Sequence, residues 1–221
     1  MSEVTITVRG EHEVRIAPER ATVHLSVRAD GPDRADAVER ALRAAESVRE
    51  SIIARHDAGE VIEWDSRHFT VHAERPWNAD GRQLPPVYHV AVDFTATFGE
   101  ASVLSTWATA ISDRDGVEIG WVDWHLTPAT RSRIEREVAA AAVGVAVARA
   151  EAYAAALGLH DVAAREIADT GLISRASKED VAPMMSARGA AFAADAGAAE
   201  MIYETQELVL SATVEGRFVA R

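Results

Sequence analysis

Hydrophobic residues alternate with polar residues near the start of this chain, and this alternation restricts its fold more than any other feature. Val4, Ile6 and Val8 alternate with threonine and arginine, and the same period of two returns over residues 20–29 and, most clearly, over residues 88–98. A period of two places the hydrophobic side chains on one face of a β-strand. Each segment therefore predicts a strand with one buried side and one water-facing side, as in antiparallel sheets that are covered on one face.

Three segments with a helical spacing of hydrophobic residues separate the strands. The first begins after Pro32 and ends near His56, the second is a short helix around Trp107, and the third runs from Pro128 to about Leu157. Proline fits the first turn of a helix, where the backbone N–H would have no partner within the helix. The spacing predicts that the third helix buries Ile134, Val138, Ala141, Val145, Ala148 and Ala152.

The strands and helices follow one another in the order ββα-ββ-α-β-α-β, then a long excursion and a last strand. The remaining strands are predicted over residues 61–74, 117–126, 162–169 and 205–219. This order predicts an α+β fold, with mainly antiparallel sheet and three helices packed on one face. We expect a single domain over residues 1–221, with two intertwined lobes (about 1–85 and 86–221) as the alternative. The excursion over residues 174–200 is rich in Ala and Met and is expected to be flexible.

Two local expectations follow from the regular period of a strand. Gly10 is expected to end the first strand, with residues 11–13 in a solvated turn. Uninterrupted alternation over residues 61–74 places Trp64 and His68 on the same face of that strand.

Composition excludes several kinds of function. The chain has 221 residues, of which 48% are hydrophobic, and this is enough for one sizeable core or two small lobes. The formal net charge of −12 opposes binding to nucleic acid, because a phosphate backbone needs clustered lysine and arginine. The chain has no cysteine, so disulfides, thiolate nucleophiles, zinc ribbons and iron–sulfur clusters are excluded. We expect no cofactor.

The apolar segments give an expectation for the compartment. Residues 1–3 lead directly into the first strand, with neither the basic region nor the apolar core of a signal peptide. The longest apolar stretch, residues 138–148, is roughly half of the ~20 residues that a membrane-spanning helix needs. We therefore expect a soluble, cytoplasmic protein without membrane insertion.

Several segments, taken in order, resemble one known family. They lie at residues 6–14, 17–23, 86–90, 116–120, 152–159 and 183–185. Their order and spacing resemble the SIMPL domain family, which includes bacterial periplasmic and outer-membrane-associated antigens and a eukaryotic protein that associates with a pelle-like kinase. The resemblance implies the α+β fold and, because some bacterial members form large homo-oligomers, a homo-oligomer. The family has no agreed catalytic residues to transfer, and His12 stands where the family has a glycine.

Three histidines are the strongest candidates for a chemical site. His24, His89 and His125 each fall on the polar side of a predicted strand. If these strands are neighbours, the imidazoles approach one another with Asp93 or Asp123 nearby, which would suit a metal ion or a proton transfer. The alternative is that the water-facing sides of strands simply carry polar residues. The chain has no phosphate-binding glycine loop, nucleophile elbow or His-Glu-x-x-His pair.

Two tryptophans are candidate contact residues. Trp121 shares the polar side of its predicted strand with Asp123 and His125. An aromatic ring on a water-facing side indicates that a helix, a ligand or another subunit covers it, and we favour a helix or a subunit. Trp77, in the hairpin tip at residues 75–86, is either a contact residue or part of an exposed loop.

Three functions remain open, and we favour them in this order. The first is a non-catalytic binding or assembly protein that acts as a homo-oligomer, since the chain carries no catalytic motif and places aromatic rings on outer strand faces. The second is an enzyme that binds a small molecule or a metal ion on the histidine-bearing strand face. The third is an adaptor that docks onto another protein through the loops at residues 75–86 and 174–200.

Overall fold

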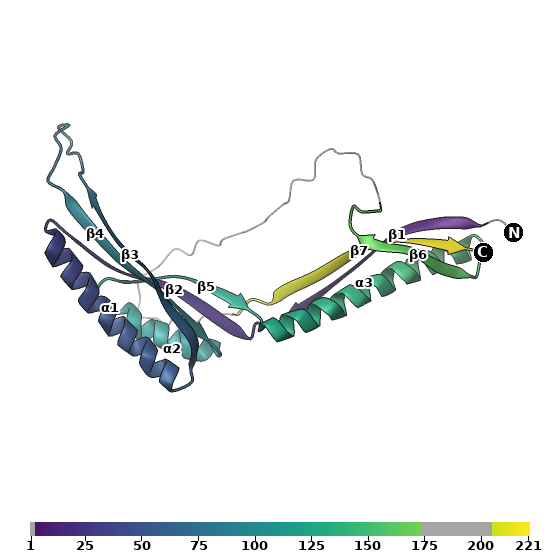
Figure 1. Cartoon of the computed structure of the whole chain (residues 1–221), viewed down its shortest axis with the longest axis horizontal. Helices are drawn as coiled ribbons and strands as arrows, with labels where there is room; N and C mark the ends of the chain where they lie inside the picture. Colours follow the sequence, from purple (N-terminus) through teal and green to yellow (C-terminus); the bar gives the residue numbers. More distant parts are fainter. Residues whose placement is uncertain (1–2, 174–204) are drawn as a thin grey trace. The chain divides into compact units, whose positions relative to one another are not determined.

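The structure is a computed structural model of the chain, and it describes residues 3–173 and 205–221. The elements in chain order are β1 (Val4–Ile16), β2 (Arg20–Gly31), α1 (Arg34–Asp57), β3 (Val61–Glu74), β4 (Val87–Phe98), α2 (Ala101–Ser112), β5 (Val117–His125), α3 (Pro128–Ala156), β6 (Val162–Asp169) and β7 (Leu208–Ala220) (Figure 1). This order confirms the predicted succession of strands and helices and the α+β class. The excursion at residues 174–200 lies outside the described residues.

The contacts divide the chain into two compact units. Of the described residues, the α3 unit consists of residues 3–16, 128–173 and 207–221, and the α1–α2 unit consists of residues 17–127 together with 205 and 206. The α1–α2 unit is thus inserted between β1 and α3. The predicted alternative, two lobes that divide near residue 85, would place the boundary in the tip between β3 and β4. These two strands pair along their length, so both sides of the tip belong to one sheet.

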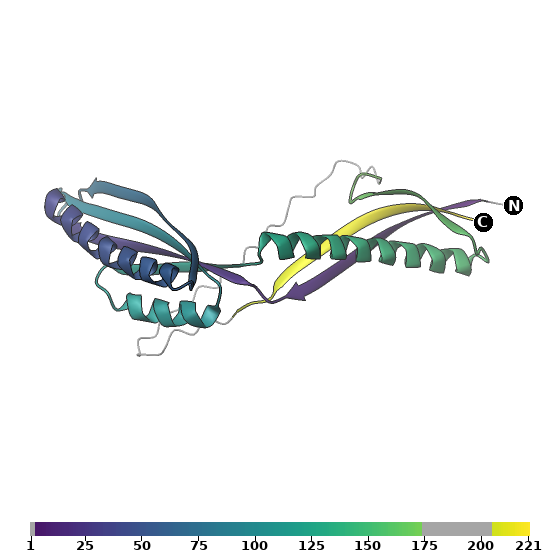
Figure 2. The ribbon, with the colours of Figure 1, turned by 60° about the horizontal axis from the view of Figure 1, so that its bottom comes forward.

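The α1–α2 unit is a four-stranded antiparallel sheet that two helices cover on one face. The strand order is β3-β4-β2-β5, and α1 and α2 lie on the same side of this sheet (Figures 1 and 2). Its buried core includes Val23, Val27, Val48, Ile52, Phe94, Phe98, Leu104, Trp107 and Ile111. Trp107 is fully buried, and its Nε1–H donates a hydrogen bond to Ser51 Oγ over 3.0 Å.

A shift in the pairing of β3 changes which of its side chains face the helices. Trp64 lies opposite Ala96 and packs against the core, whereas His68 lies opposite Asp93 on the other face of the sheet. The pairing shifts by one residue between Ser66 and His68. The prediction that Trp64 and His68 share a face is therefore wrong, because one extra residue in a strand reverses the alternation beyond it.

The α3 unit is a three-stranded antiparallel sheet with α3 along one face. β7 is the central strand, with β1 and β6 on either side, and Figure 2 shows α3 running along β1 and β7. α3 buries Ile134, Val138, Ala142, Ala146, Ala150 and Ala154.

The buried stripe of α3 differs from the predicted one after Val138. Its residues recur every four positions, and each step of four advances the buried side by about 40° around the helix. A stripe that winds in this way matches a twisted strand ribbon beneath the helix. The prediction that Ala141, Val145, Ala148 and Ala152 are buried is wrong, because it follows a straight face.

β1 continues through the segment that was predicted to turn. Gly10 pairs with Val214, and residues 11–13 pair with residues 213–211 of β7. A Cβ atom at Gly10 would clash with the carbonyl oxygen of Ala142 and would lie 2.7 Å from the amide nitrogen of Ala146. The absence of a side chain at Gly10 therefore allows β1 to pack closely against α3, and the strand continues beyond this residue.

Candidate functional site

In the described part of the chain, one face of the four-stranded sheet carries most of the histidines and no helix. Within the part of the α1–α2 unit that the structure describes, α1 and α2 both pack on the opposite face, and we call the remaining face the open face. Five of the eight histidines lie on it: His24, His68, His72, His89 and His125. The open face is therefore the first place to look for a site.

At one end of the open face, His24 joins an aromatic ring and a carboxylate. Its Nε2 lies 2.9 Å from Asp123 Oδ2, and its ring stacks on the Trp121 indole with 4.3 Å between ring centroids and 13° between planes. The indole Nε1–H donates to the same Asp123 oxygen over 3.3 Å. The three side chains form one connected group, in which 61% of Trp121 remains exposed.

An irregularity in β5 brings Trp121 over His24. The pairing of β2 with β5 shifts between Val23 and Leu25, so His24 lies opposite the irregular stretch that contains Gly120. A Cβ atom at Gly120 would lie 3.2 Å from the backbone oxygen of His24, so glycine allows this close approach.

His125 lies beside this group and belongs to a row of hydroxyls. Its Nε2 is 2.9 Å from Thr22 Oγ1, which is also 2.8 Å from Thr97 Oγ1. Thr22 pairs with Asp123 across β2 and β5, so His24 and His125 lie at the same end of the open face. Both of these imidazoles therefore have neutral or acidic partners within hydrogen-bond distance.

His89 lies at the other end of the open face. Its Nδ1 is 2.7 Å from Asp30 Oδ1, its Nε2 is 3.6 Å from Glu74, and its ring stacks on His72 with centroids 4.9 Å apart. Asp30 is six residues along β2 from His24, which corresponds to about 20 Å. The structure therefore brings His24 and His125 to one end and places His89 at the other. Among the described residues, no group of three or more His, Asp and Glu side chains is arranged to hold a metal ion.

A hollow of about 520 Å³ lies on the open face beside Trp121. His24, Ser26, Arg67, His68, Asp93 and Trp121 are among the residues that line it. An adjoining hollow of about 550 Å³ extends towards His72 and His89 and shares Ser26 and Asp93 with the first. The alternation of hydrophobic residues places Ser26 on the polar side of β2, but no motif in the sequence marks it as a site residue.

The two arginines that line the hollow form ion pairs with carboxylates. Arg28 forms an ion pair with Glu118 at 2.8 Å, and Arg67 forms one with Asp65 at 3.2 Å. The Asp93 carboxylate, by contrast, makes no hydrogen bond or ion pair within residues 3–173 and 205–221. The Ser26 hydroxyl is enclosed and likewise has no hydrogen-bond partner in this part of the chain.

Trp77 lies apart from the open-face groups, in the tip of the β3–β4 hairpin. It is 68% exposed and forms an isolated β-bridge with Gln83. The Oδ1 atom of Asn78 accepts backbone hydrogen bonds from Asp80 and Arg82, at 3.1 and 2.8 Å, and these bonds fix the shape of the tip. The tip thus presents an exposed aromatic ring on an ordered turn.

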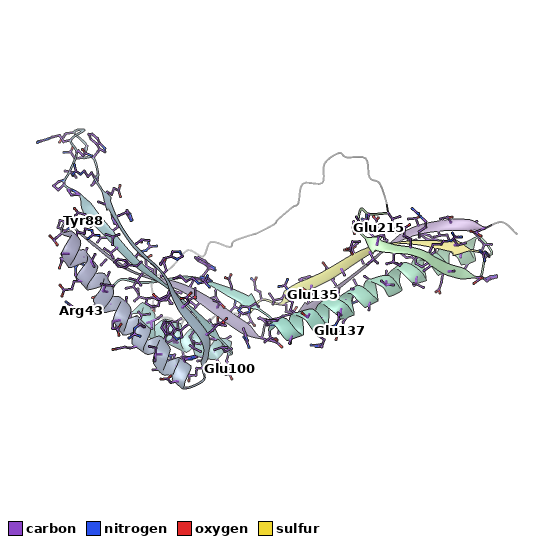
Figure 3. The ribbon with its side chains drawn as sticks, in the orientation of Figure 1. Arg43, Tyr88, Glu100, Glu135, Glu137 and Glu215 are labelled. Carbon is purple, nitrogen blue, oxygen red and sulfur yellow. The ribbon has the colours of Figure 1, made fainter. Side chains whose placement is uncertain are left out.

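The α3 unit carries a second candidate surface on its helix. Residues 138–148 of α3 contain no polar or charged side chain, and Glu135 and Glu137 precede this stretch (Figure 3). The exposed residues of the stretch are Ala139, Ala140, Gly144 and Ala148, and we call them the outer face of α3. By length and composition alone, α3 is also apolar enough to cross a membrane.

The chain is thus an α+β protein with an open sheet face in one unit and an uncharged helix face in the other. The model of the SIMPL family, described as a protein of unknown function (DUF541), matches residues 6–218. The chain belongs to this family, which confirms the resemblance seen in the sequence. No curated protein matches the chain.

Proposed function

We propose that the protein is a non-catalytic binding and assembly protein that acts as a homo-oligomer. The observation that carries this proposal is the outer face of α3. Eleven successive residues of a helix that is exposed on one side carry no charge, over a length of about 16 Å. Uncharged surfaces of this kind usually mark contacts with other macromolecules.

The charges that flank the outer face favour a second copy of the same chain as the partner. Arg136 and Glu151 are exposed and form no ion pair within the described residues. Along the sequence, Arg136 and Glu151 are equally far from the centre of the outer face, which falls between Val143 and Gly144. In an antiparallel pair of α3 helices, Arg136 of each copy would therefore lie opposite Glu151 of the other, and a two-fold axis forms this contact twice.

The small residues of the outer face suit such a pair. Ala140, Gly144 and Ala148 recur every four residues and follow Arg136 at the same spacing, so the four form one stripe that turns by about 40° per step around the exposed side of the helix. Side chains of this size let two helices approach to the short end of the usual 8–10 Å range, about 8 Å between axes. A homo-oligomer is also what the family resemblance implies.

The test is a charge exchange read by sedimentation velocity of the full chain. Arg136→Glu or Glu151→Arg alone places like charges together at both contacts and is expected to weaken association by about tenfold. The double variant restores opposite charges and is expected to restore association. Arg34→Glu, which makes the same charge change at the start of α1, is the control. A monomer at every concentration, or a double variant that associates no better than the single ones, would refute the proposal.

A second candidate function is the binding of a small molecule on the open face. The observation that favours it is the hollow beside Trp121, whose Asp93 carboxylate and enclosed Ser26 hydroxyl have no side-chain partner among the described residues. We propose binding here without a metal or proton-transfer step through His24, His89 and His125, since His89 lies about 20 Å from His24 along β2. This candidate concerns the α1–α2 unit only and is independent of assembly through α3.

A further inference from the structure

We infer that the hollow beside Trp121 binds a small organic cation that also carries an aromatic ring. This inference deepens the second candidate function and rests on it. Its basis is the juxtaposition, in one hollow, of an exposed indole with a carboxylate and an enclosed hydroxyl that have no partner among the described residues.

Within the described residues, one negative charge of the hollow has no partner. Both arginines that line it already have carboxylate partners, Arg28 with Glu118 and Arg67 with Asp65. Asp93 has none in the described part of the chain, and its neighbour His68 forms no ion pair there either. A cationic ligand would compensate this carboxylate, whereas an anionic ligand would meet a like charge.

The Ser26 hydroxyl lies beside this carboxylate and can accept a hydrogen bond from the same ligand. Buried polar groups nearly always have a hydrogen-bond partner, so a hydroxyl without one points to a partner that is not part of the chain. Ser26 lies directly opposite Asp93 across β2 and β4, which places the two side chains about 5 Å apart. Rotation of the Ser26 side chain to another staggered position would present its hydroxyl to the hollow. One ammonium group, with three N–H donors, can then serve both oxygens.

The exposed indole of Trp121 lies on the far side of the hollow from Asp93. Trp121 stacks on His24 with one side of its ring and is still 61% exposed. The backbone of Trp121 lies about 10 Å from that of Asp93 across two strand spacings, and about 7 Å, or two residues, along the strand direction. An aromatic ring joined to an ammonium by a short alkyl chain spans the gap that remains between the two side chains. Its ring would pack against the indole while its ammonium reaches Asp93.

The experiment compares three probes that share a phenyl ring on a short alkyl chain and carry a positive, neutral or negative end group. They are 3-phenylpropylammonium, 3-phenylpropan-1-ol and 3-phenylpropanoate, titrated into the full chain by isothermal calorimetry at about pH 8, where free imidazole is neutral. The ammonium is expected to bind at least about tenfold more tightly than the carboxylate, since hydrogen bonds to charged groups are the stronger ones. Asp93→Asn is expected to remove about tenfold of the ammonium affinity.

Two further variants test the charge and the ring contact separately. Asp57→Asn removes one exposed carboxylate from the end of α1, so it makes the same change in net charge and is expected to leave the affinity within about twofold. Trp121→Leu is expected to weaken all three probes, because it removes the ring contact without changing the charge. If Asp93→Asn fails to fold, the ranking of the three probes on the unaltered chain still decides the inference.

Each outcome is decisive. A carboxylate probe that binds as tightly as the ammonium, or an ammonium affinity that Asp93→Asn leaves unchanged, overturns the cation inference while small-molecule binding stands. If none of the three probes binds at up to about 10 mM, a range that includes weak fragments of this size, the second candidate function is itself refuted, and the inference with it.

Discussion

Replacing Gly10 with alanine is expected to destabilise the α3 unit. Gly10 lies in the middle of β1, where a Cβ atom would clash with the backbone oxygen of Ala142 and would lie 2.7 Å from the backbone nitrogen of Ala146. Both atoms belong to the α3 backbone, which cannot move aside as the end of a flexible side chain can. α3 must therefore shift away from β1, and its buried alanines lose contact with the sheet.

The size of the effect follows from two opposing terms. Forcing one extra methyl group into a packed core costs about 1–3 kcal/mol. The same substitution restricts the unfolded chain and returns about 0.4–1 kcal/mol. Because the Cβ atom would meet two backbone atoms of the helix, the cost belongs in the upper part of its range. We expect a net loss of about 2 kcal/mol in the free energy of unfolding.

Urea unfolding by two probes measures this loss and locates it. All five tryptophans lie between residues 64 and 124, so their fluorescence follows the α1–α2 unit, whereas far-UV circular dichroism follows both units. The circular dichroism transition is expected to move to lower urea, and the fluorescence transition is expected to move less. Hydrogen exchange of the α3 amides should become faster in the variant.

Gly99→Ala is the matched control, because it makes the same change outside the α3 unit and outside the proposed contact between copies. A Cβ atom at Gly99 meets only the end of the Ile62 side chain, at the ordinary contact distance of 3.6 Å. Gly99→Ala is therefore expected to change the free energy of unfolding by less than about 1 kcal/mol. If Gly10→Ala proves as stable as the unaltered chain, the close approach of β1 to α3 is not what requires glycine there.

Two further predictions concern the α1–α2 unit. Trp107→Phe removes the hydrogen bond to Ser51 and leaves a gap in a fully buried position, so thermal unfolding should show a loss of about 1–3 kcal/mol, and an unchanged midpoint would contradict the packing described. Gly116 and Gly81 both have positive φ, 76° and 71°, but only at Gly116 would a Cβ atom clash, with the carbonyl oxygen of Arg28. Gly116→Ala should therefore cost at least about 1 kcal/mol more than Gly81→Ala in urea unfolding, and equal costs would count against the clash.

Periodicity predicted the fold where strands alternate without interruption. The pairing of β2 with β4 keeps Leu25 opposite Phe94 under the helices, as a period of two requires. Periodicity gave the wrong prediction where one extra residue breaks the pattern. The extra residue near Arg67 reverses the faces of β3, and no residue type in that stretch announces it. Gly10 is compatible both with a turn and with a close approach, and only the position of α3 decides between them.

The candidate site shows the same division between local pattern and pairing. The alternation predicted that His24, His89 and His125 each lie on the polar side of their own strand, because it fixes the direction of a side chain. Alternation does not fix distance along the sheet. The register of β2 against β4 places His89 opposite Asp30, and the separation from His24 follows from that pairing alone. Ser26 emerges only from the structure, because its neighbours Asp93 and Glu118 follow from the pairing of β2 with β4 and β5.

The central position of β7 has a consequence for the order in which the chain can fold. β7 pairs Ala220 with Val4 and Leu208 with Ile16, so the three-stranded sheet joins segments separated by about two hundred residues. Every strand of the four-stranded sheet lies within residues 20–125 and can pair as soon as that stretch has left the ribosome. Among these strands β1 emerges first, but its edge must wait for β7 and its apolar side for α3, which covers it. Contacts this distant in sequence close slowly, so synthesis exposes β1 to chaperones and to other nascent chains for longer than any other strand described.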